Sequence, residues 1–184
     1  MLLLEKLYTF EEFWDIAQLP ENEDKRLELE DGVIVEMPSS SPTNTVTAMR
    51  IGHFLNAFVI PRDLGWVTGA DGGFKLGTRQ SRQPDVGFIS KVRVPELPKR
   101  FLLAPDLAIE IVSPNEDIYK KALEYLRAGT RIVWAVYSED KTVHVMRLDE
   151  DGGIKSLPFG IEATVDGGDV LPGFTLAVRD IFPG

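Results

Sequence analysis

Two short apolar runs in this chain each carry one acidic residue. Asp85 precedes the run 86–89 (Val-Gly-Phe-Ile), and Glu110 lies inside the run 107–112 (Leu-Ala-Ile-Glu-Ile-Val). Runs of this length and composition predict buried strands. Moving a carboxylate out of water costs several kcal/mol unless a positive charge compensates it. Because two such carboxylates on neighbouring strands would repel each other, the pattern predicts a cation between them.

A helical pattern follows these strands and offers a positive side chain. Apolar residues at spacings of four and three predict a helix from residue 117 to 128 with one face against the sheet. The residues of that face are Ile118, Ala122 and Tyr125. At about 100° per residue, Lys121 lies on the flank of this face, whereas Lys120 points to nearly the opposite side. We therefore expect Lys121 near Asp85 and Glu110, and a surface lysine whose ammonium reaches solvent is the alternative interpretation.

These residues supply the components of metal-assisted phosphodiester hydrolysis, which are two carboxylates, a divalent metal and a lysine. A simpler interpretation of Asp85 is a turn residue that follows Pro84 at the start of a strand. Glu110 has no comparable structural explanation, because it lies in mid-strand between Ile109 and Ile111.

Two further acidic residues are accessory candidates. Glu28 lies between Leu27 and Leu29, so its side chain faces away from the side that those leucines bury. Exposure is the default for Glu28, but it becomes a third carboxylate if that face covers the cleft. Asp117 precedes Lys121 by four residues, so the two side chains can pair along the helix surface.

The distribution of charge along the chain is uneven. The net charge of −9 argues by itself against a nucleic-acid partner. Residues 75–100, however, contain seven basic and two acidic residues, which leaves the rest of the chain at about −14. The candidates in this segment for contacts with a phosphate backbone are Arg79, Arg82, Lys91 and Arg93. A pair of solvated loops that are basic by chance is the alternative interpretation.

Length and composition are those of a soluble protein. The 184 residues are 43% apolar, enough to bury a core, and predict one domain over residues 1–184. The absence of cysteine excludes disulfides and thiolate metal sites and favours a reducing compartment. The start is apolar for only three residues after Met1, which predicts no signal peptide, and no later run is long enough to cross a bilayer. We therefore expect a cytoplasmic protein without a membrane partner.

Capping residues, turns and apolar spacing predict a mixed order of helices and strands. Helices are expected at 9–18, 41–59 and 117–128. Hairpins are expected at 26–37 around Asp31-Gly32, at 66–76 around 71–73, and at 132–146. A proline-rich loop, 90–105, separates the two acidic strands, and the Gly- and Asp-rich tail from 149 predicts edge strands and turns.

The chain resembles the PD-(D/E)XK nuclease superfamily, and within it the Uma-two branch of putative restriction endonucleases. The resemblance covers most of the chain and lies in the order and spacing of several motifs. These are 27–37 (LELEDGVIVEM), 83–86 (QPDV), 105–114 (PDLAIEIVSP), and 171–174 (LPGF) with Asp180-Ile181-Phe182. The residues that fall where the branch has similar ones are Asp117, Lys121, Tyr125, Ala128-Gly129 and Trp134.

The resemblance implies a restriction-endonuclease-like α/β (α+β) fold, in which a central mixed β-sheet is flanked by helices. It also implies that Asp85 and Glu110, with the carbonyl of Ile111, bind Mg²⁺ or Mn²⁺. The parent motif has a lysine two residues after the glutamate, where this chain has Val112. In the Uma-two branch that lysine is thought to have moved to the following helix, which again indicates Lys121.

The resulting hypothesis is a metal-dependent endonuclease that hydrolyses DNA phosphodiester bonds, with Asp85, Glu110 and Lys121 as catalytic residues. Glu28 is the candidate for holding a second metal or for supporting the helix. One alternative is an RNA- or junction-specific nuclease with the same site, and the other is a catalytically idle interaction protein that retains the fold. Net acidity favours the idle protein, whereas the intact carboxylates and lysine favour the enzyme. Double-strand cleavage in this superfamily usually needs two active sites, which makes a homodimer plausible.

Overall fold

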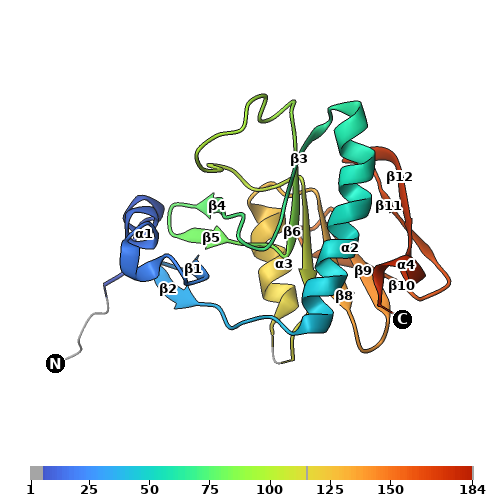
Figure 1. The fold of residues 1–184 in the computed structure, drawn as a ribbon, viewed down its shortest axis with the longest axis horizontal. Helices are drawn as coiled ribbons and strands as arrows, with labels where there is room; N and C mark the ends of the chain where they lie inside the picture. The colour runs from blue at the N-terminus through green and yellow to red at the C-terminus, as the bar shows by residue number, and fades with distance from the viewer. Residues whose placement is uncertain (1–5, 115, 184) are drawn as a thin grey trace.

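The computed structural model describes residues 6–114 and 116–183 and is built around a six-stranded mixed sheet (Figure 1). Its strand order is β10-β9-β8-β7-β6-β3. The strands are β3 (Gly65–Thr68), β6 (Val86–Ser90), β7 (Leu107–Ile111), β8 (Ile132–Tyr137), β9 (Thr142–Leu148) and β10 (Ile154–Phe159). β7 and β8 are parallel, and the other neighbouring pairs of this sheet are antiparallel. The predicted fold class, a central mixed sheet flanked by helices, is confirmed.

Two helices cover opposite faces of the central sheet. Successive side chains of a strand point to opposite faces, so neighbouring residues of β7 pack against different helices. α2 (Pro42–Val59) shares a buried apolar cluster with Ile109 of β7. α3 (Ile118–Arg127) shares another with Ala108, the preceding residue. Glu110, two residues after Ala108, therefore projects from β7 on the α3 face.

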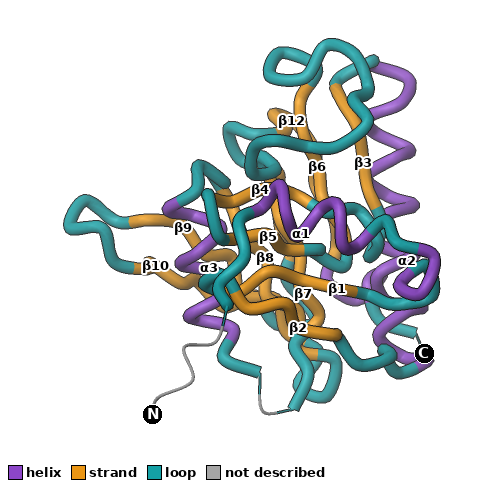
Figure 2. Tube along the Cα trace, turned by 90° about the vertical axis from the view of Figure 1, so that its left-hand side faces the viewer, coloured by secondary structure: helices purple, strands orange, loops and turns teal. Residues whose placement is uncertain are grey.

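A second sheet of four short strands lies beside the central one, in the order β2-β1-β5-β4. Its strands are β1 (Leu27–Glu30), β2 (Val33–Glu36), β4 (Phe74–Gly77) and β5 (Gln80–Arg82). α1 (Phe10–Ala17) covers this sheet, and its Phe13 packs in one cluster with Leu29 of β1. Figure 2 views the molecule from the side that α1 and the four-stranded sheet cover.

The C-terminal segment completes the α2 side of the molecule. β11 (Thr164–Gly167) and β12 (Leu171–Ala177) form a two-stranded antiparallel sheet, and α4 (Val178–Ile181) follows directly. Phe174 of β12 packs edge-on against Phe58 of α2, with ring centroids 5.4 Å apart. Two 3₁₀ turns, η1 (Pro20–Asn22) and η2 (Ile60–Arg62), follow α1 and α2.

Most of the predicted elements are confirmed at their predicted places. The Thr9–Glu12 capping box begins α1, and Ser41 caps α2 through a hydrogen bond from the backbone N–H of Asn44. Asp31-Gly32 joins β1 to β2, and Gly129 follows α3 with a positive φ of 105°, a conformation that glycine adopts readily. The hairpin of β8 and β9 is also found.

The predicted hairpin over residues 66–76 is wrong. Its first strand, β3, pairs with β6 at the edge of the central sheet, whereas its second, β4, pairs with β5 in the small sheet. β3 can lie close to β6 because Gly65 has no side chain, and a Cβ there would lie 2.2 Å from the carbonyl oxygen of Ile89. Phe74 of β4 is fully buried between the two sheets, where it stacks on Phe101 at 4.6 Å and packs in one cluster with Ile89 of β6.

Within residues 6–114 and 116–183, no helix combines the length and apolar character that crossing a bilayer requires. The predicted absence of a signal peptide rests on the first few residues of the chain. Residues 1–5 lie outside the described part, so that prediction stays untested.

Candidate active site

The antiparallel pairing of β6 and β7 brings the two predicted carboxylates together. Val86 lies opposite Ile109, so the next pair in the same register is Asp85 and Glu110. Side chains directly opposite each other on an antiparallel pair have Cβ atoms about 4.5–5.5 Å apart. Both side chains project toward α3, on the face opposite to that of Ile109. Asp85 is fixed by the backbone N–H of Ile111, which donates to its Oδ2 at 2.8 Å.

Glu110 is held by two side chains of α3. Lys121 Nζ donates to Glu110 Oε2 at 3.0 Å, and the hydroxyl of Tyr125 donates to Oε1 at 2.7 Å. Lys121 also donates to Glu116 at 3.2 Å. Glu110 and Lys121 are 2% and 6% exposed, whereas the side chain of Lys120 is 52% exposed. The helix register expected from the sequence is therefore confirmed: Lys121 faces the two carboxylates and Lys120 faces outward.

These groups open onto a cavity of 910 Å³ at one end of the central sheet. The wall includes Asp85, Glu110, Lys121, Glu116 and Arg26. The rest of the rim comes from the segment before α2, the loop after β7 and the turn between β8 and β9. In Figure 1 these three segments lie together near the N-terminal end of α2.

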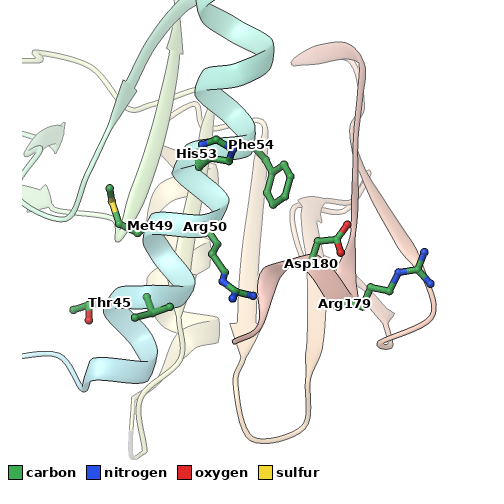
Figure 3. A pocket seen from close by; sticks show the side chains of 8 residues that line it. Thr45, Met49, Arg50, His53, Phe54, Arg179 and Asp180 are labelled. Atoms are coloured by element: carbon green, nitrogen blue, oxygen red, sulfur yellow. The ribbon is translucent and has the colours of Figure 1, made fainter. Parts of the chain in front are cut away.

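Another hollow, of 630 Å³, lies along the outer side of α2 near α4 (Figure 3). It is lined by Met49, His53, Phe54 and Asp180, among others. Two arginines, Arg50 and Arg179, also line it, and the guanidinium of Arg50 donates to the backbone carbonyl of Phe182. The paired acidic residues and Lys121 line the first cavity and not this one, so the first cavity is the candidate active site.

Burial governs the electrostatics of the site. Burial raises the pKa of Glu110 to about 7 against the favourable charge of Lys121, and the charge of Asp85 raises it further. Burial also raises the pKa of Asp85, although the Ile111 N–H opposes this shift. For Lys121, burial alone would lower the pKa, but the charges of Glu110, Glu28 and Glu116 outweigh it and raise the pKa. Lys121 thus stays protonated while Glu110 gives up its proton near neutrality.

The free energy of unfolding of the metal-free protein should fall as the pH rises from about 5 to 7. The pKa of Glu110 is 4.5 in its ordinary state and about 7 in the folded protein, so the folded state binds more protons between these values. The contribution of Glu110 to the free energy of unfolding is fully present at low pH and is lost as the pH rises through the pKa that Glu110 has in the folded protein. We expect a loss of about 2 kcal/mol, since one pKa unit corresponds to roughly 1.4 kcal/mol. Asp85, whose pKa is also raised, acts in the same direction.

Urea unfolding at several pH values in the presence of a chelator measures this loss. The matched variant is Glu110→Gln, which keeps the shape of the side chain and cannot ionise. Its stability should fall less over the same pH range, because only the contribution of Asp85 remains. Equal pH dependence in wild type and Glu110→Gln would contradict the assignment of this titration to Glu110.

Glu28 is fully buried, so the default expectation of exposure is wrong. Its Oε2 accepts from Arg82 Nη1 at 2.8 Å, and its Oε1 accepts from the backbone N–H of Gln83 at 2.8 Å. Arg82 explains the burial, because it supplies the compensating charge inside the protein. Glu28 does not line the cavity, although its charge reaches Glu110 and Lys121.

The prediction that Arg82 contacts a phosphate backbone is wrong, because its guanidinium is buried and paired with carboxylates of the protein. Arg82 is 3% exposed and its guanidinium also binds Glu30 at 2.5 Å and Glu124 at 2.6 Å. With Glu28, three carboxylates thus pair with the Arg82 guanidinium, which links β5 to β1 and α3. Asp117 likewise differs from its predicted role as a partner of Lys121. Its carboxylate accepts from the backbone N–H of Lys120 at 3.0 Å and caps the helix.

The remaining basic candidates do not surround the cavity. Lys91 and Arg93 follow the far end of β6, and Lys91 lies six residues from Asp85, roughly 20 Å along an extended chain. Lys91 pairs with Asp63, and Arg93 pairs with Asp106 at 3.0 Å. Arg79 is exposed in the turn between β4 and β5. The basic segment is therefore continuous in sequence but spread over the molecule in space.

Three residues of the site were missed by the sequence reasoning. Tyr125 was assigned to the apolar helix face and matched to the Uma-two branch without a role in the site, yet its hydroxyl reaches Glu110. Glu116 precedes the helix and turns back to Lys121. Arg26 precedes β1 and gave no signal of its own, because its position depends on contacts with residues more than 40 positions away.

Comparisons with known proteins agree with this fold. Residues 10–179 match the model of the Uma2 family, described as putative restriction endonuclease. The fold is similar to the crystal structure of a putative nuclease belonging to DUF820 from Anabaena variabilis ATCC 29413. The two are 26% identical with a TM-score of 0.80, and the match covers 95% of this chain and 97% of that one. No curated protein matches this chain.

Proposed function

This chain belongs to the Uma2 family of putative restriction endonucleases, and from that premise we propose that it is a metal-dependent endonuclease acting on DNA phosphodiester bonds. The family and the similarity to a nuclease structure support nuclease activity. The observation that carries the finer proposal is the pair of the partly buried Asp85 and the buried Glu110, with Lys121 beside Glu110 in the same cavity. We further propose that residues 1–184 act as one nuclease-like domain.

The residues of the cavity fit a magnesium-like ion. Mg²⁺ is usually held by one or two carboxylates and keeps several waters. Two carboxylates with raised pKa values are groups whose negative charge is incompletely compensated, which a cation would relieve. Each Glu110 oxygen accepts one hydrogen bond, so lone pairs remain, because a carboxylate offers about four acceptor positions. Among the described residues no group of three His, Asp or Glu could hold a metal, so the proposed site relies on this pair.

Asp85, Glu110 and the Ile111 carbonyl are the proposed ligands. The Ile111 N–H points to the β6 edge of β7, where it meets Asp85, and the carbonyl of a strand residue points to the same edge as its N–H. A bound Mg²⁺ or Mn²⁺ would polarise the phosphate and lower the pKa of a coordinated water. Tyr125 would keep the Glu110 carboxylate in a fixed orientation. Two of these ligands belong to β7 and the third, Asp85, directly precedes its neighbour β6, so the sheet holds them close together.

Lys121 would supply positive charge to the reacting phosphate and orient the attacking water. Its raised pKa keeps it protonated at neutral pH, so it serves as a hydrogen-bond donor and not as a base. A positioned donor in a desolvated site stabilises developing negative charge more strongly than the same group does in water. When substrate binds, Lys121 would give up part of its hydrogen bonding to Glu110 and donate to the reacting phosphate instead.

Cleavage of supercoiled plasmid in magnesium or manganese, with a chelator as control, tests this proposal. Parallel assays on single-stranded DNA, structured RNA and branched DNA distinguish the DNA endonuclease from the RNA- or junction-specific alternative. Cleavage of both strands would use two sites, which a homodimer could supply, and the mass of the active species tests that. If no nucleic acid is cleaved and millimolar magnesium leaves the melting temperature unchanged, the idle interaction protein is the better interpretation, in keeping with the net charge of −9.

A further inference from the structure

Arg26 is one of two cationic side chains that line the cavity among the described residues, and the other is Lys121. Lys121 already contacts Glu110 and Glu116. The guanidinium of Arg26 approaches Asp85 without a hydrogen bond, since Nη2 lies 3.8 Å from Oδ1. Arg26 is therefore the cation of the cavity whose charge is least engaged by carboxylates.

Two backbone carbonyls fix the plane of the Arg26 guanidinium. Nε donates to the carbonyl of Ala70 at 3.1 Å, and Nη2 donates to that of Gln83 at 3.0 Å. Both acceptors lie in segments that join the two sheets, Ala70 between β3 and β4 and Gln83 between β5 and β6, two residues before Asp85. Arginine has five N–H donors, so these bonds use only part of its capacity. No described residue accepts a hydrogen bond from Nη1, and the side chain is 20% exposed.

We propose that Arg26 binds a backbone phosphate of the nucleic acid, next to the position of Asp85. This inference rests on the proposed function and adds a substrate-binding residue to it. The guanidinium is planar and its free end can bind two phosphate oxygens at once. Because the carbonyls hold the group in place, little side-chain entropy is lost on binding.

The acidic rim of the cavity strengthens this inference. Glu116 and the exposed Glu139 and Asp140 lie around the opening, and they would repel a phosphate there. The backbone of a substrate is attracted to the cavity only where positive charge outweighs these groups. Arg26 lies on the wall of the cavity that the small sheet contributes. A phosphate bound to Arg26 would therefore determine on which side of Asp85 the nucleic-acid strand continues.

A structural role is the competing interpretation, since Arg26 also holds the Gln83 carbonyl. Salt dependence separates the two, because each phosphate contact with a duplex contributes about −0.9 to the slope of log K against log salt concentration. A residue that only supports the loop leaves this slope unchanged. The variants are Arg26→Gln, which removes the charge, and Arg26→Lys, which keeps the charge and loses the planar fork. The control is Arg127→Gln, which removes an exposed arginine from the last turn of α3.

Binding of a fluorescent DNA duplex is measured by anisotropy in calcium at several salt concentrations, with the duplex verified to be intact afterwards. Arg26→Gln should bind more weakly with a slope smaller by about 0.9, Arg26→Lys should keep the slope and bind less tightly than wild type, and Arg127→Gln should match wild type. Melting curves establish that each variant is folded, and the Arg26→Lys result stands if Arg26→Gln does not fold.

The outcomes distinguish this inference from the proposed function. Wild-type slope and affinity in folded Arg26→Gln, or an equal effect of Arg127→Gln, would overturn the role of Arg26 and leave the nuclease proposal intact. If Arg26→Gln does not fold, Arg26→Lys with wild-type affinity would overturn it instead. Wild-type protein that binds no DNA would overturn both.

Discussion

Lys121→Ala should lower the rate of phosphodiester cleavage by on the order of a hundredfold or more, whereas Lys120→Ala should stay close to wild type. The two lysines are adjacent in sequence and lie on different sides of α3. Lys121 is 6% exposed and contacts Glu110, while the side chain of Lys120 is 52% exposed and lies 3.8–3.9 Å from three carboxylates at the surface. A difference of this size between the cleavage rates of the two variants would distinguish a catalytic role of Lys121 from a general effect of removing one positive charge.

Initial rates on one plasmid substrate, at saturating magnesium, provide the measurement. Lys121→Ala also leaves Glu110 and Glu116 without their shared cation, so its metal-free form should be less stable. That loss should be larger at about pH 8 than at about pH 6, because Glu110 can take up a proton at the lower pH. Rates are therefore compared only under conditions in which melting curves show both variants folded. Equal cleavage by wild type and Lys121→Ala would rule out this lysine as the stabilising cation.

Local sequence signals were sufficient for most of the fold and for the centre of the site. The capping residues of α1 and α2 and the Asp31-Gly32 turn are short-range features, and each determines an element boundary by itself. The burial of Glu110 followed from its apolar neighbours, and the position of Lys121 followed from the period of one helix. In all of these cases the evidence lies within a few residues.

What could not be predicted depends on pairing between distant segments. β3 and β4 looked like a hairpin because a glycine-rich turn joins them, but each has a better partner elsewhere. Arg82 was predicted to contact phosphate because it lies in the basic segment 75–100, and only the fold places it among carboxylates of β1 and α3. Arg26 is in the cavity because Ala70 and Gln83 hold it there. A single sequence contains no local signal for such contacts.

Arg82→Ala should lower the free energy of unfolding by about 3–5 kcal/mol, because it leaves the buried carboxylate of Glu28 without a basic partner. Glu28 is the most affected, since it is fully buried and loses its only basic partner among the described residues. Glu124 lies one position before Tyr125, so the loss should also loosen the part of α3 that holds Glu110. Urea unfolding at neutral pH measures the change.

The matched control is Arg79→Ala, three residues earlier in the same hairpin and exposed. An exposed substitution of this kind usually changes stability by less than about 0.5 kcal/mol. The double variant Arg82→Ala with Glu28→Gln should recover part of the loss, because it removes the buried charge that Arg82 compensated. If Arg82→Ala were as stable as Arg79→Ala but bound DNA with a reduced salt slope, Arg82 would be a phosphate contact after all. Its burial between three carboxylates makes loss of stability the expected result.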